Sequence, residues 1–243
     1  MNLVTDFGNT LVKIALVDDD SITKSLRSVD EGEIVDFIGQ YSGRFHRSII
    51  STVREVPSAV MKLIEAKSDF LHILSPGSEL PFKIDYDTPD TLGMDRVAAV
   101  AGAYNKYDAG SVLVIDAGTA ITYDVLFNGR YSGGSISPGI DMRFRALNSF
   151  TGRLPLVERD ETIEYPARST RSGINSGVLI GIVFEINEYI REFEKKYSDT
   201  LVILTGGDAG FLSGKISAYH EFDPDLVING LNYILNYNAR KNK

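Results

Sequence analysis

Residues 6–16 read DFGNTLVKIAL, and residues 116–126 read DAGTAITYDVL. Each stretch follows a short apolar run, turns at an Asp-x-Gly motif and enters a second apolar run, which predicts two strands joined by a tight turn. Asp6 matches Asp116 and Gly8 matches Gly118, 110 residues apart. The same motif in the same setting indicates an internal duplication.

The two halves are expected to be α/β domains at residues 1–109 and 110–243. A third strand is predicted after each copy of the motif, at 21–26 and 129–136. Helices and buried strands then alternate along the rest of the chain. The expected helices are 31–41, 57–66, 95–104, 140–148, 174–197 and 226–237, and the expected further strands are 48–51, 70–74, 112–115 and 201–204.

The composition is that of an ordinary globular protein, with 43% apolar and 24% charged residues in 243. A formal net charge of -8 argues against a general nucleic-acid binder. There are no cysteines, and the three histidines are far apart, so a zinc site is not expected. No apolar run approaches the ~18 residues of a membrane helix, and we expect a soluble, cytoplasmic protein.

The two Asp-Gly turns admit two interpretations. Either they are hairpin turns and nothing more, or their backbone N–H groups and polar side chains hold phosphate groups from two sides. Carboxylates repel phosphates, so Asp6 and Asp116 suit the second interpretation only with a bound cation such as Mg²⁺ between them and a nucleotide. Lys13 could add positive charge there.

Two further stretches carry candidate chemistry. The sequence TGGDA, residues 205–209, follows a buried strand and opens a helix, an arrangement that lets a backbone approach a nucleotide closely. The sequence YDTPDTLGMDR, residues 86–96, places a carboxylate and a guanidinium together. Asp95 could accept a proton from a substrate hydroxyl, and Arg96 could fix an anionic or polar substrate. The alternative is a helix N-terminal carboxylate with a surface partner.

Taken in order, these motifs resemble the type III pantothenate kinases, of the actin, hexokinase and Hsp70-like phosphotransferase superfamily. The resemblance spans nearly the whole chain. It rests on Asp6-x-Gly8-Asn9-Thr10 with Lys13, on Gly93-Met94-Asp95-Arg96 preceded by Tyr86 and Pro89, on DAGTA at 116–120, on GGSISPG at 133–139 and on TGGDA. It implies two duplicated ribonuclease H-like (actin-like ATPase) α/β domains with a central ATP cleft.

The resemblance also implies roles for residues of this chain. Asp95 would be the catalytic base in the transfer of the ATP γ-phosphate to the 4'-hydroxyl of pantothenate, the first step of coenzyme A biosynthesis. Asp116 would hold a monovalent cation, K⁺ or NH₄⁺, and Asp6 would hold Mg²⁺ through water. The ATP-binding residues would be Asp6, Phe7, Gly8, Asn9, Thr10, Leu11, Val12, Lys13 and Thr119; the pantothenate-binding residues would be Tyr86, Gly93, Met94, Asp95, Arg96 and Thr170.

Thr170 departs from the family pattern in its neighbour, because the family usually has Asn-Thr where this chain has Ser169-Thr170. Members of the family are homodimers. Gly177 and Gly181, four residues apart in the long helix expected at 174–197, would suit close packing in a soluble core or at a dimer interface.

Three other functions stay open from the sequence. The first is another kinase of the superfamily, acting on a sugar or an acetate-like acid, because the fold does not determine the acceptor. The second is a non-enzymatic regulator that binds a nucleotide on the same scaffold. The third is a protein in which the Asp-Gly turns are only structural, and which does not bind ATP.

Overall fold

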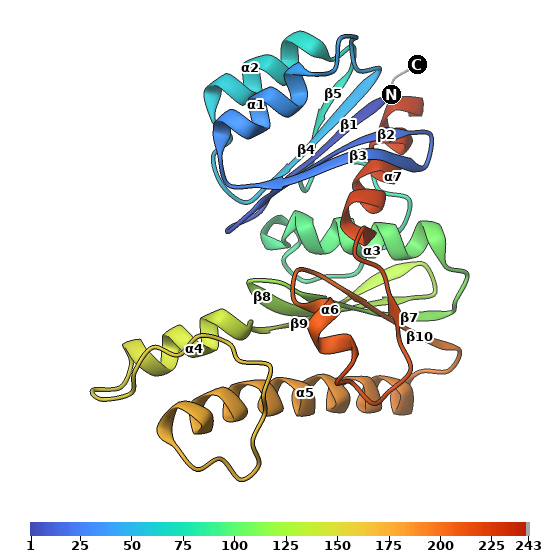
Figure 1. Cartoon of the computed structure of the whole chain (residues 1–243). Coiled ribbons are helices and arrows are strands. Elements are labelled where there is room, and N and C mark those ends of the chain that lie inside the picture. The colour runs from blue at the N-terminus through green and yellow to red at the C-terminus, as the bar shows by residue number, and fades with distance from the viewer. Residues whose placement is uncertain (242–243) are drawn as a thin grey trace. The chain divides into compact units, whose positions relative to one another are not determined.

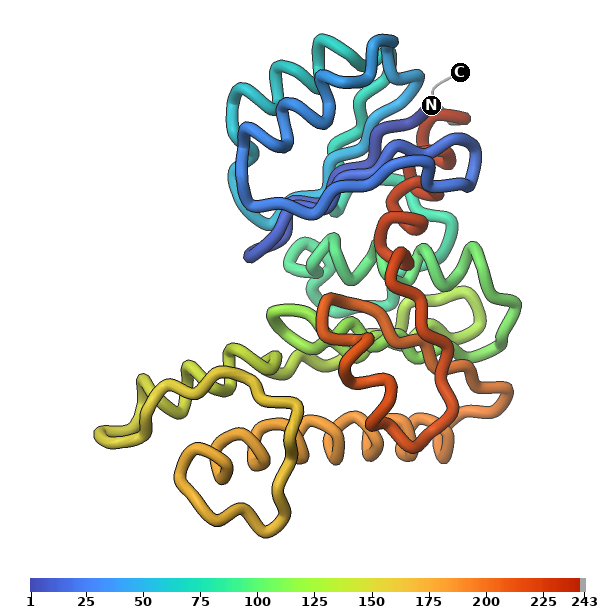
Figure 2. Tube along the Cα trace, viewed as in Figure 1, coloured from blue at the N-terminus to red at the C-terminus, as the bar shows by residue number. Residues whose placement is uncertain are grey.

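The computed structural model describes residues 1–241, which divide into two compact units (Figure 1). Unit 1 comprises Met1–Asp108, Gly129–Ser132 and the segment from Asp225 onward, and unit 2 comprises Ala109–Asn128 and Gly133–Pro224. The expected ranges 1–109 and 110–243 differ from this division chiefly in the last helix, which belongs with unit 1. In Figure 2 the colour along the trace shows that the chain passes through unit 2 before it forms that helix, which is red.

Unit 1 is built on a five-stranded sheet of order β3-β2-β1-β4-β5. The hairpin partners are antiparallel, whereas β1 pairs parallel with β4, and β4 with β5. The strands are β1 (Asn2–Phe7), β2 (Val12–Asp18), β3 (Ser21–Ser28), β4 (Arg47–Thr52) and β5 (Leu71–Ile73).

Alternation along β1 sends its side chains to two different helical layers. Leu3 and Phe7 belong to a buried apolar cluster with residues of α1 (Glu31–Gly39) and α2 (Ser58–Lys67). Asn2, on the opposite face, donates a hydrogen bond to Asn232 of α7 (Leu226–Lys241). Asp6 has the same parity as Asn2, so it lies on the face that α7 covers.

The helices α3 (Met94–Lys106) and α7 meet at two glycines. A Cβ atom on Gly230 would lie 1.8 Å from the carbonyl oxygen of Ala98, and one on Gly102 would lie 2.2 Å from that of Leu226. Both glycines are therefore required by close approach of the two backbones. This contact explains why the last helix joins unit 1 although 117 residues separate it from Asp108.

Unit 2 repeats the strand order of unit 1. Its sheet runs β9-β8-β7-β10-β11, with β7 antiparallel to β8 and parallel to β10, as β1 is to β2 and β4. The predicted duplication and fold class are confirmed. The strands are β7 (Ser111–Ala117), β8 (Ala120–Phe127), β9 (Arg130–Pro138), β10 (Thr200–Thr205) and β11 (Glu221–Phe222).

The helices of unit 2 are α4 (Ile140–Ser149), α5 (Thr170–Lys196) and α6 (Ala209–Ser213). Ile174, Val178, Ile182 and Ile186 place one face of α5 in the core of this unit. The glycine face is different, because a Cβ atom on Gly177 or Gly181 would meet nothing within 4 Å. These glycines therefore do not pack in the core of this unit, and their use at a dimer interface stays a prediction.

Three short elements have no counterpart among the expected ones: β6 (Lys83–Ile84), the 3₁₀ helix η1 (Pro89–Thr91) and β11. Two or three residues cannot establish a periodicity, so composition alone does not reveal them. β6 pairs parallel with Arg130 and Tyr131 of β9. Within residues 1–241 no helix is both long enough and apolar enough to cross a membrane.

Candidate active site

The DFGNT segment forms the turn of the β1–β2 hairpin. Phe7 pairs with Val12 as the last rung, and the Gly8 N–H donates to the Leu11 carbonyl at 3.2 Å. The side chains of Phe7 and Val12 are buried in the cluster with α1 and α2, whereas Asn9 and Thr10 are exposed. Phe7 and Val12 can therefore offer a phosphate only their backbones, and the polar tip of the turn is accessible.

Asp6, the residue before the last of β1, lies between two polar side chains on the neighbouring strands. It pairs with Lys13 across the antiparallel side and with Ser51 across the parallel side, so all three side chains lie on one face. Burial raises the pKa of Asp6 above its ordinary value, Lys13 lowers it, the carboxylate of Asp95 raises it, and Ser51 lowers it. Asp95 is thus close enough to Asp6 to raise its pKa. That the two residues belong to one active site stays a prediction.

Asp95 stands in the first turn of α3, where the helix dipole favours a negative charge. Its Oδ1 accepts a hydrogen bond from the Arg96 N–H at 2.9 Å. A Cβ atom on Gly93 would lie 2.5 Å from that same Oδ1. The glycine of the Gly-Met-Asp-Arg motif is therefore explained by the space that the Asp95 carboxylate occupies. Met94 is the first residue of the helix.

Arg96 is buried beside an aromatic pair. Its guanidinium carbon lies 5.9 Å from the centroid of the Tyr131 ring, and the Tyr131 ring lies 5.9 Å from that of Tyr86. Tyr131 is fully buried and comes from β9, beside the short strand that leads to Tyr86. The sequence interpretation missed Tyr131. Nothing in the residues around it indicates a contact with Arg96, which lies 35 positions earlier in the chain.

The DAGTA turn of unit 2 is enclosed by two glycines. Gly206 has a φ of +103°, and a Cβ there would lie 2.5 Å from both Asp116 Oδ1 and the Ala117 carbonyl oxygen. A Cβ on Gly139 would lie 2.4 Å from the Thr119 carbonyl oxygen. Thr119 is exposed, and Asp116 is half-buried. The turn presents a carboxylate and carbonyl oxygens in a small space, which is the donor set that hard cations prefer.

The TGGDA segment connects β10 to α6, as predicted. Asp208 donates its N–H to the Ala117 carbonyl at 2.9 Å, which joins this loop to the DAGTA turn. Burial raises the pKa of Asp208, while Arg159, bonded to it at 2.7 Å, lowers it and Asp141 raises it. The guanidinium of Arg159 also lies 4.8 Å from the Phe211 ring centroid. An adenosine contact of this loop stays a prediction.

Thr170 is exposed at the N-terminus of α5 in unit 2. Ser169 is the N-cap, and its side chain and that of Ser172 form a reciprocal capping box. Serine and asparagine are both good N-caps, so Ser169 replaces the usual asparagine without loss of this function. Tyr86, Asp95 and Arg96 belong to unit 1, and a shared pantothenate site with Thr170 stays a prediction.

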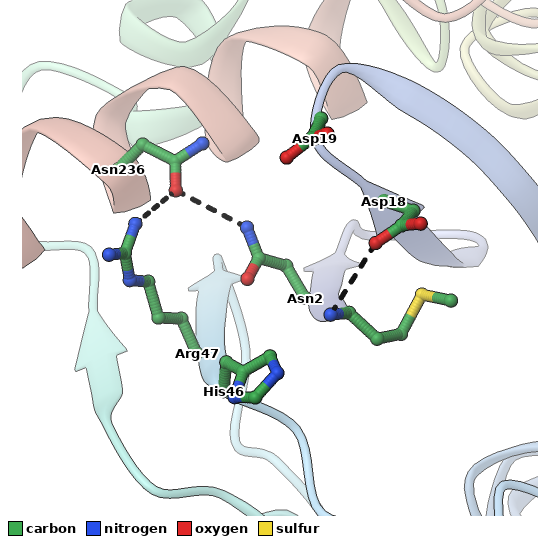
Figure 3. Close-up of a pocket in the computed structure, with 7 residues that line it drawn as sticks. Asn2, Asp18, Asp19, His46, Arg47 and Asn236 are labelled. Atoms are coloured by element: carbon green, nitrogen blue, oxygen red, sulfur yellow. Dashed lines mark hydrogen bonds and ion pairs between the residues drawn. The ribbon is translucent and has the colours of Figure 1, made fainter.

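A polar pocket of about 230 Å³ lies at the other end of β1 (Figure 3). Asn236 accepts hydrogen bonds from Arg47 at 2.7 Å and from Asn2 at 3.3 Å. Asn2 precedes Asp6 by four residues, or about 13 Å along an extended strand. The pocket is therefore separate from the Asp6 site.

A family model described as type III pantothenate kinase matches residues 2–192. A type III pantothenate kinase of Bacteroides fragilis strain YCH46 is 41% identical, and the match covers 98% of each chain. One from Phocaeicola vulgatus is 39% identical over 99% of this chain and 100% of its own. The chain belongs to the type III pantothenate kinase family. The ordered motifs that suggested this resemblance are thus confirmed at the level of the family.

Solved structures support the fold. A Campylobacter jejuni protein assigned to the Baf family of transcriptional activators matches with a TM-score of 0.64 and 23% identity, covering 98% of this chain and 99% of its own. An inorganic polyphosphate/ATP-glucomannokinase from Arthrobacter matches with a TM-score of 0.50 and 13% identity, covering 97% and 98%. At these identities the matches show a common fold only.

Proposed function

We propose that this protein is an ATP-dependent pantothenate kinase that transfers the γ-phosphate of ATP to the 4'-hydroxyl of pantothenate and yields 4'-phosphopantothenate, the first step of coenzyme A biosynthesis. Family membership supports the reaction. The observation that carries the assignment to residues is the proximity of Asp95, at the start of α3, to Asp6, at the end of β1. The candidate base is then a neighbour of the candidate phosphate turn within unit 1.

Asp95 acts as the general base in this proposal. Its carboxylate is half-buried and held by the Arg96 N–H, so it can reach a substrate hydroxyl and accept its proton as the bond to phosphorus forms. The remaining catalysis is positioning and neutralisation of charge on the transferred phosphoryl group. The N–H groups of the turn at 9–11 and the ammonium of Lys13 would contribute to both.

A divalent cation suits the environment of Asp6. The proton affinity of the Asp6 carboxylate is raised by burial and by the neighbouring Asp95 carboxylate. Its ionised form would be stabilised by a cation that lies between it and the phosphates. Mg²⁺ is usually bound through one or two carboxylates together with substrate phosphates, and it neutralises the charge that develops during transfer. Asp6 would hold Mg²⁺ through water.

Asp116 would hold the monovalent cation, K⁺ or NH₄⁺. The support is the free space beside Asp116 Oδ1. Gly206 and Gly118 border this space, and a Cβ atom at either position would reduce it. Thr119, exposed on the same turn, would contact ATP.

Pantothenate would be recognised by Tyr86, the segment Gly93–Arg96 and Thr170. Arg96 is held against Tyr131, so its guanidinium is preorganised to bind the carboxylate of pantothenate. The planar guanidinium suits such a carboxylate better than a neutral sugar, which favours pantothenate over a sugar acceptor.

We also propose a homodimer that forms through the exposed face of α5. Gly177, Gly181 and Phe184 share that face at helical spacing, and the Phe184 side chain is 70% exposed. A Gly181→Arg variant should shift the protein from dimer to monomer in light scattering after size exclusion. Gly39→Arg, at another exposed glycine with nothing within 4 Å, should leave the mass unchanged. Equal masses for both variants would contradict this interface.

The decisive assay measures ADP release with ATP and Mg²⁺, with and without pantothenate, in K⁺ and in Na⁺ buffer. We expect release that depends on pantothenate and is faster in K⁺. Release with a sugar or acetate instead would identify a different kinase of the superfamily. ATP binding without pantothenate-dependent release would identify a nucleotide-binding regulator, and absence of ATP binding would leave the turns structural. A cytoplasmic location is proposed because both substrates are soluble metabolites.

A further inference from the structure

Two buried hydroxyl groups occupy equivalent places in the duplicated units. Ser51 on β4 is the parallel-strand partner of Asp6, and Thr205 on β10 is the parallel-strand partner of Asp116. In each unit the aspartate stands near the end of the central strand, and the hydroxyl residue stands across from it on the next parallel strand. Directly paired residues share a face of the sheet, so each hydroxyl lies beside its aspartate.

Both hydroxyl groups are buried, and neither makes a hydrogen bond of ordinary geometry. Ser51 is 0% exposed and Thr205 is 1% exposed, and neither side-chain oxygen has a hydrogen-bond partner among residues 1–241. Buried polar groups are nearly always paired, because burial without a partner costs free energy. Neighbouring buried hydroxyls follow that rule: Thr5 donates to the Ile49 carbonyl at 2.9 Å, and Ser48 bonds to Ser68 at 2.6 Å. The unpaired state of Ser51 and Thr205 is therefore an exception that needs a reason.

Each hydroxyl is near the carboxylate that could be its partner. Ser51 lowers the pKa of Asp6 as a hydrogen-bonding neighbour does, so the two side chains are close, although the Ser51 hydroxyl makes no hydrogen bond of ordinary geometry. On the other unit, Asp116 Oδ1 lies beside Gly206, the residue that follows Thr205, within 2.5 Å of where a Cβ would be. Each hydroxyl thus faces a carboxylate across the sheet, and an O–H···O bond to a carboxylate is stronger than a bond between neutral groups.

We propose that Ser51 and Thr205 are positioning residues, a duplicated pair of hydroxyls that donate to Asp6 and Asp116 and hold these carboxylates in the orientation that binds the cations and phosphates of ATP. This inference rests on the proposed function of the two aspartates. The hydroxyl stays unpaired in the free protein, and the bond forms when the bound cation fixes the carboxylate. The free energy of an unpaired buried group is thereby recovered on binding.

The test uses Ser51→Ala and Thr205→Val, which remove the hydroxyls and keep the shape of each side chain nearly unchanged. Thermal unfolding is measured without ligand and again with Mg²⁺ and ATP. Without ligand, both variants should unfold at or above the wild-type temperature, because an unsatisfied polar group has been removed. With Mg²⁺ and ATP, their stabilisation should fall, in keeping with about tenfold weaker nucleotide binding or more.

Conservative variants and a matched control separate this role from a structural one. Ser51→Thr and Thr205→Ser retain the hydroxyl and should restore at least part of the nucleotide response. Ser48→Ala, on the same strand as Ser51, removes a hydroxyl that is already paired. It should lower the unfolding temperature without ligand and leave the ATP-dependent increase unchanged.

Nucleotide stabilisation equal to the wild type in both Ser51→Ala and Thr205→Val would overturn the proposal, as would a large loss of stability in the absence of ligand. Pantothenate-dependent ADP release by the wild type is measured separately. If that release is absent while the variants still lose their response to Mg²⁺ and ATP, the proposed reaction fails and the positioning role stands.

Discussion

The contact between α3 and α7 gives the most quantitative prediction, for Gly230→Ala. The added Cβ would lie 1.8 Å from the Ala98 carbonyl oxygen and 2.6 Å from the Gly102 nitrogen, whereas real Cβ contacts essentially never fall below 3.0 Å. Both neighbours are backbone atoms, so no side chain can rotate away. The two helices must separate by roughly 1 Å, and the packing between them loosens.

The cost can be estimated from two opposing effects. Overpacking of this kind destabilises by about 3 kcal/mol, and alanine in place of glycine inside a helix returns up to about 1 kcal/mol. The net loss of about 2 kcal/mol corresponds to a fall of about 4–8 °C in Tm for a chain of this size. The rate constant kcat should fall as well, because α3 carries Asp95 in its first turn.

Differential scanning calorimetry on the wild type, Gly230→Ala and Gly39→Ala measures this effect. Gly39 is the exposed last residue of α1, where a Cβ would meet nothing within 4 Å, so its substitution should leave Tm unchanged or slightly higher. A Tm for Gly230→Ala within about 1 °C of the wild type would show that the helices absorb the methyl group without separating, contrary to the packing argument.

Three further predictions concern the site. Asp95→Asn should lower kcat by about 10²- to 10⁴-fold while the affinity for ATP with Mg²⁺, measured by calorimetry, stays nearly unchanged; normal turnover would remove Asp95 from the role of base. Burial raises the pKa of Asp6 in the folded protein. The contribution of Asp6 to the free energy of unfolding is therefore fully present below its ordinary pKa, where it is protonated, and is lost as the pH rises through the raised pKa. Asp6→Asn should therefore raise Tm more at about pH 8 than at about pH 5 while nucleotide binding is lost, and a gain that shrinks with pH would contradict this sign. Tyr131→Leu should raise the KM for pantothenate by about 2- to 30-fold through loss of the cation–π contact with Arg96, with the KM for ATP unchanged; equal increases in both values would argue for a general structural effect.

The sequence predicted the architecture well because the deciding signals are local and repeated. Asp6 and Asp116 each end a buried strand before a glycine turn, and the shared strand order of the two sheets follows from that repeat. Asp95 was placed correctly near the start of a helix by its acidic character and the apolar period behind it.

The missing parts depend on contacts between distant residues. Tyr131 reaches Arg96 through a two-residue strand pairing that leaves no periodic pattern. Gly230 and Gly102 are single glycines in helices, and nothing local distinguishes a close backbone contact from a tolerated glycine. Ser51 stands next to the end of a short strand, and only the strand register shows that it pairs with Asp6.

The place of α7 in unit 1 has a consequence for synthesis on the ribosome. β1 emerges first, yet the helix that covers it and packs on α3 begins at residue 226. At roughly 5–20 residues per second, the ribosome takes on the order of 10 s to make the 117 residues between Asp108 and that helix. Throughout that time the face of the nascent sheet that carries Asp6 is without its covering helix. Unit 1, whose first strand is made before any of unit 2, therefore cannot complete its fold until α7 has been made.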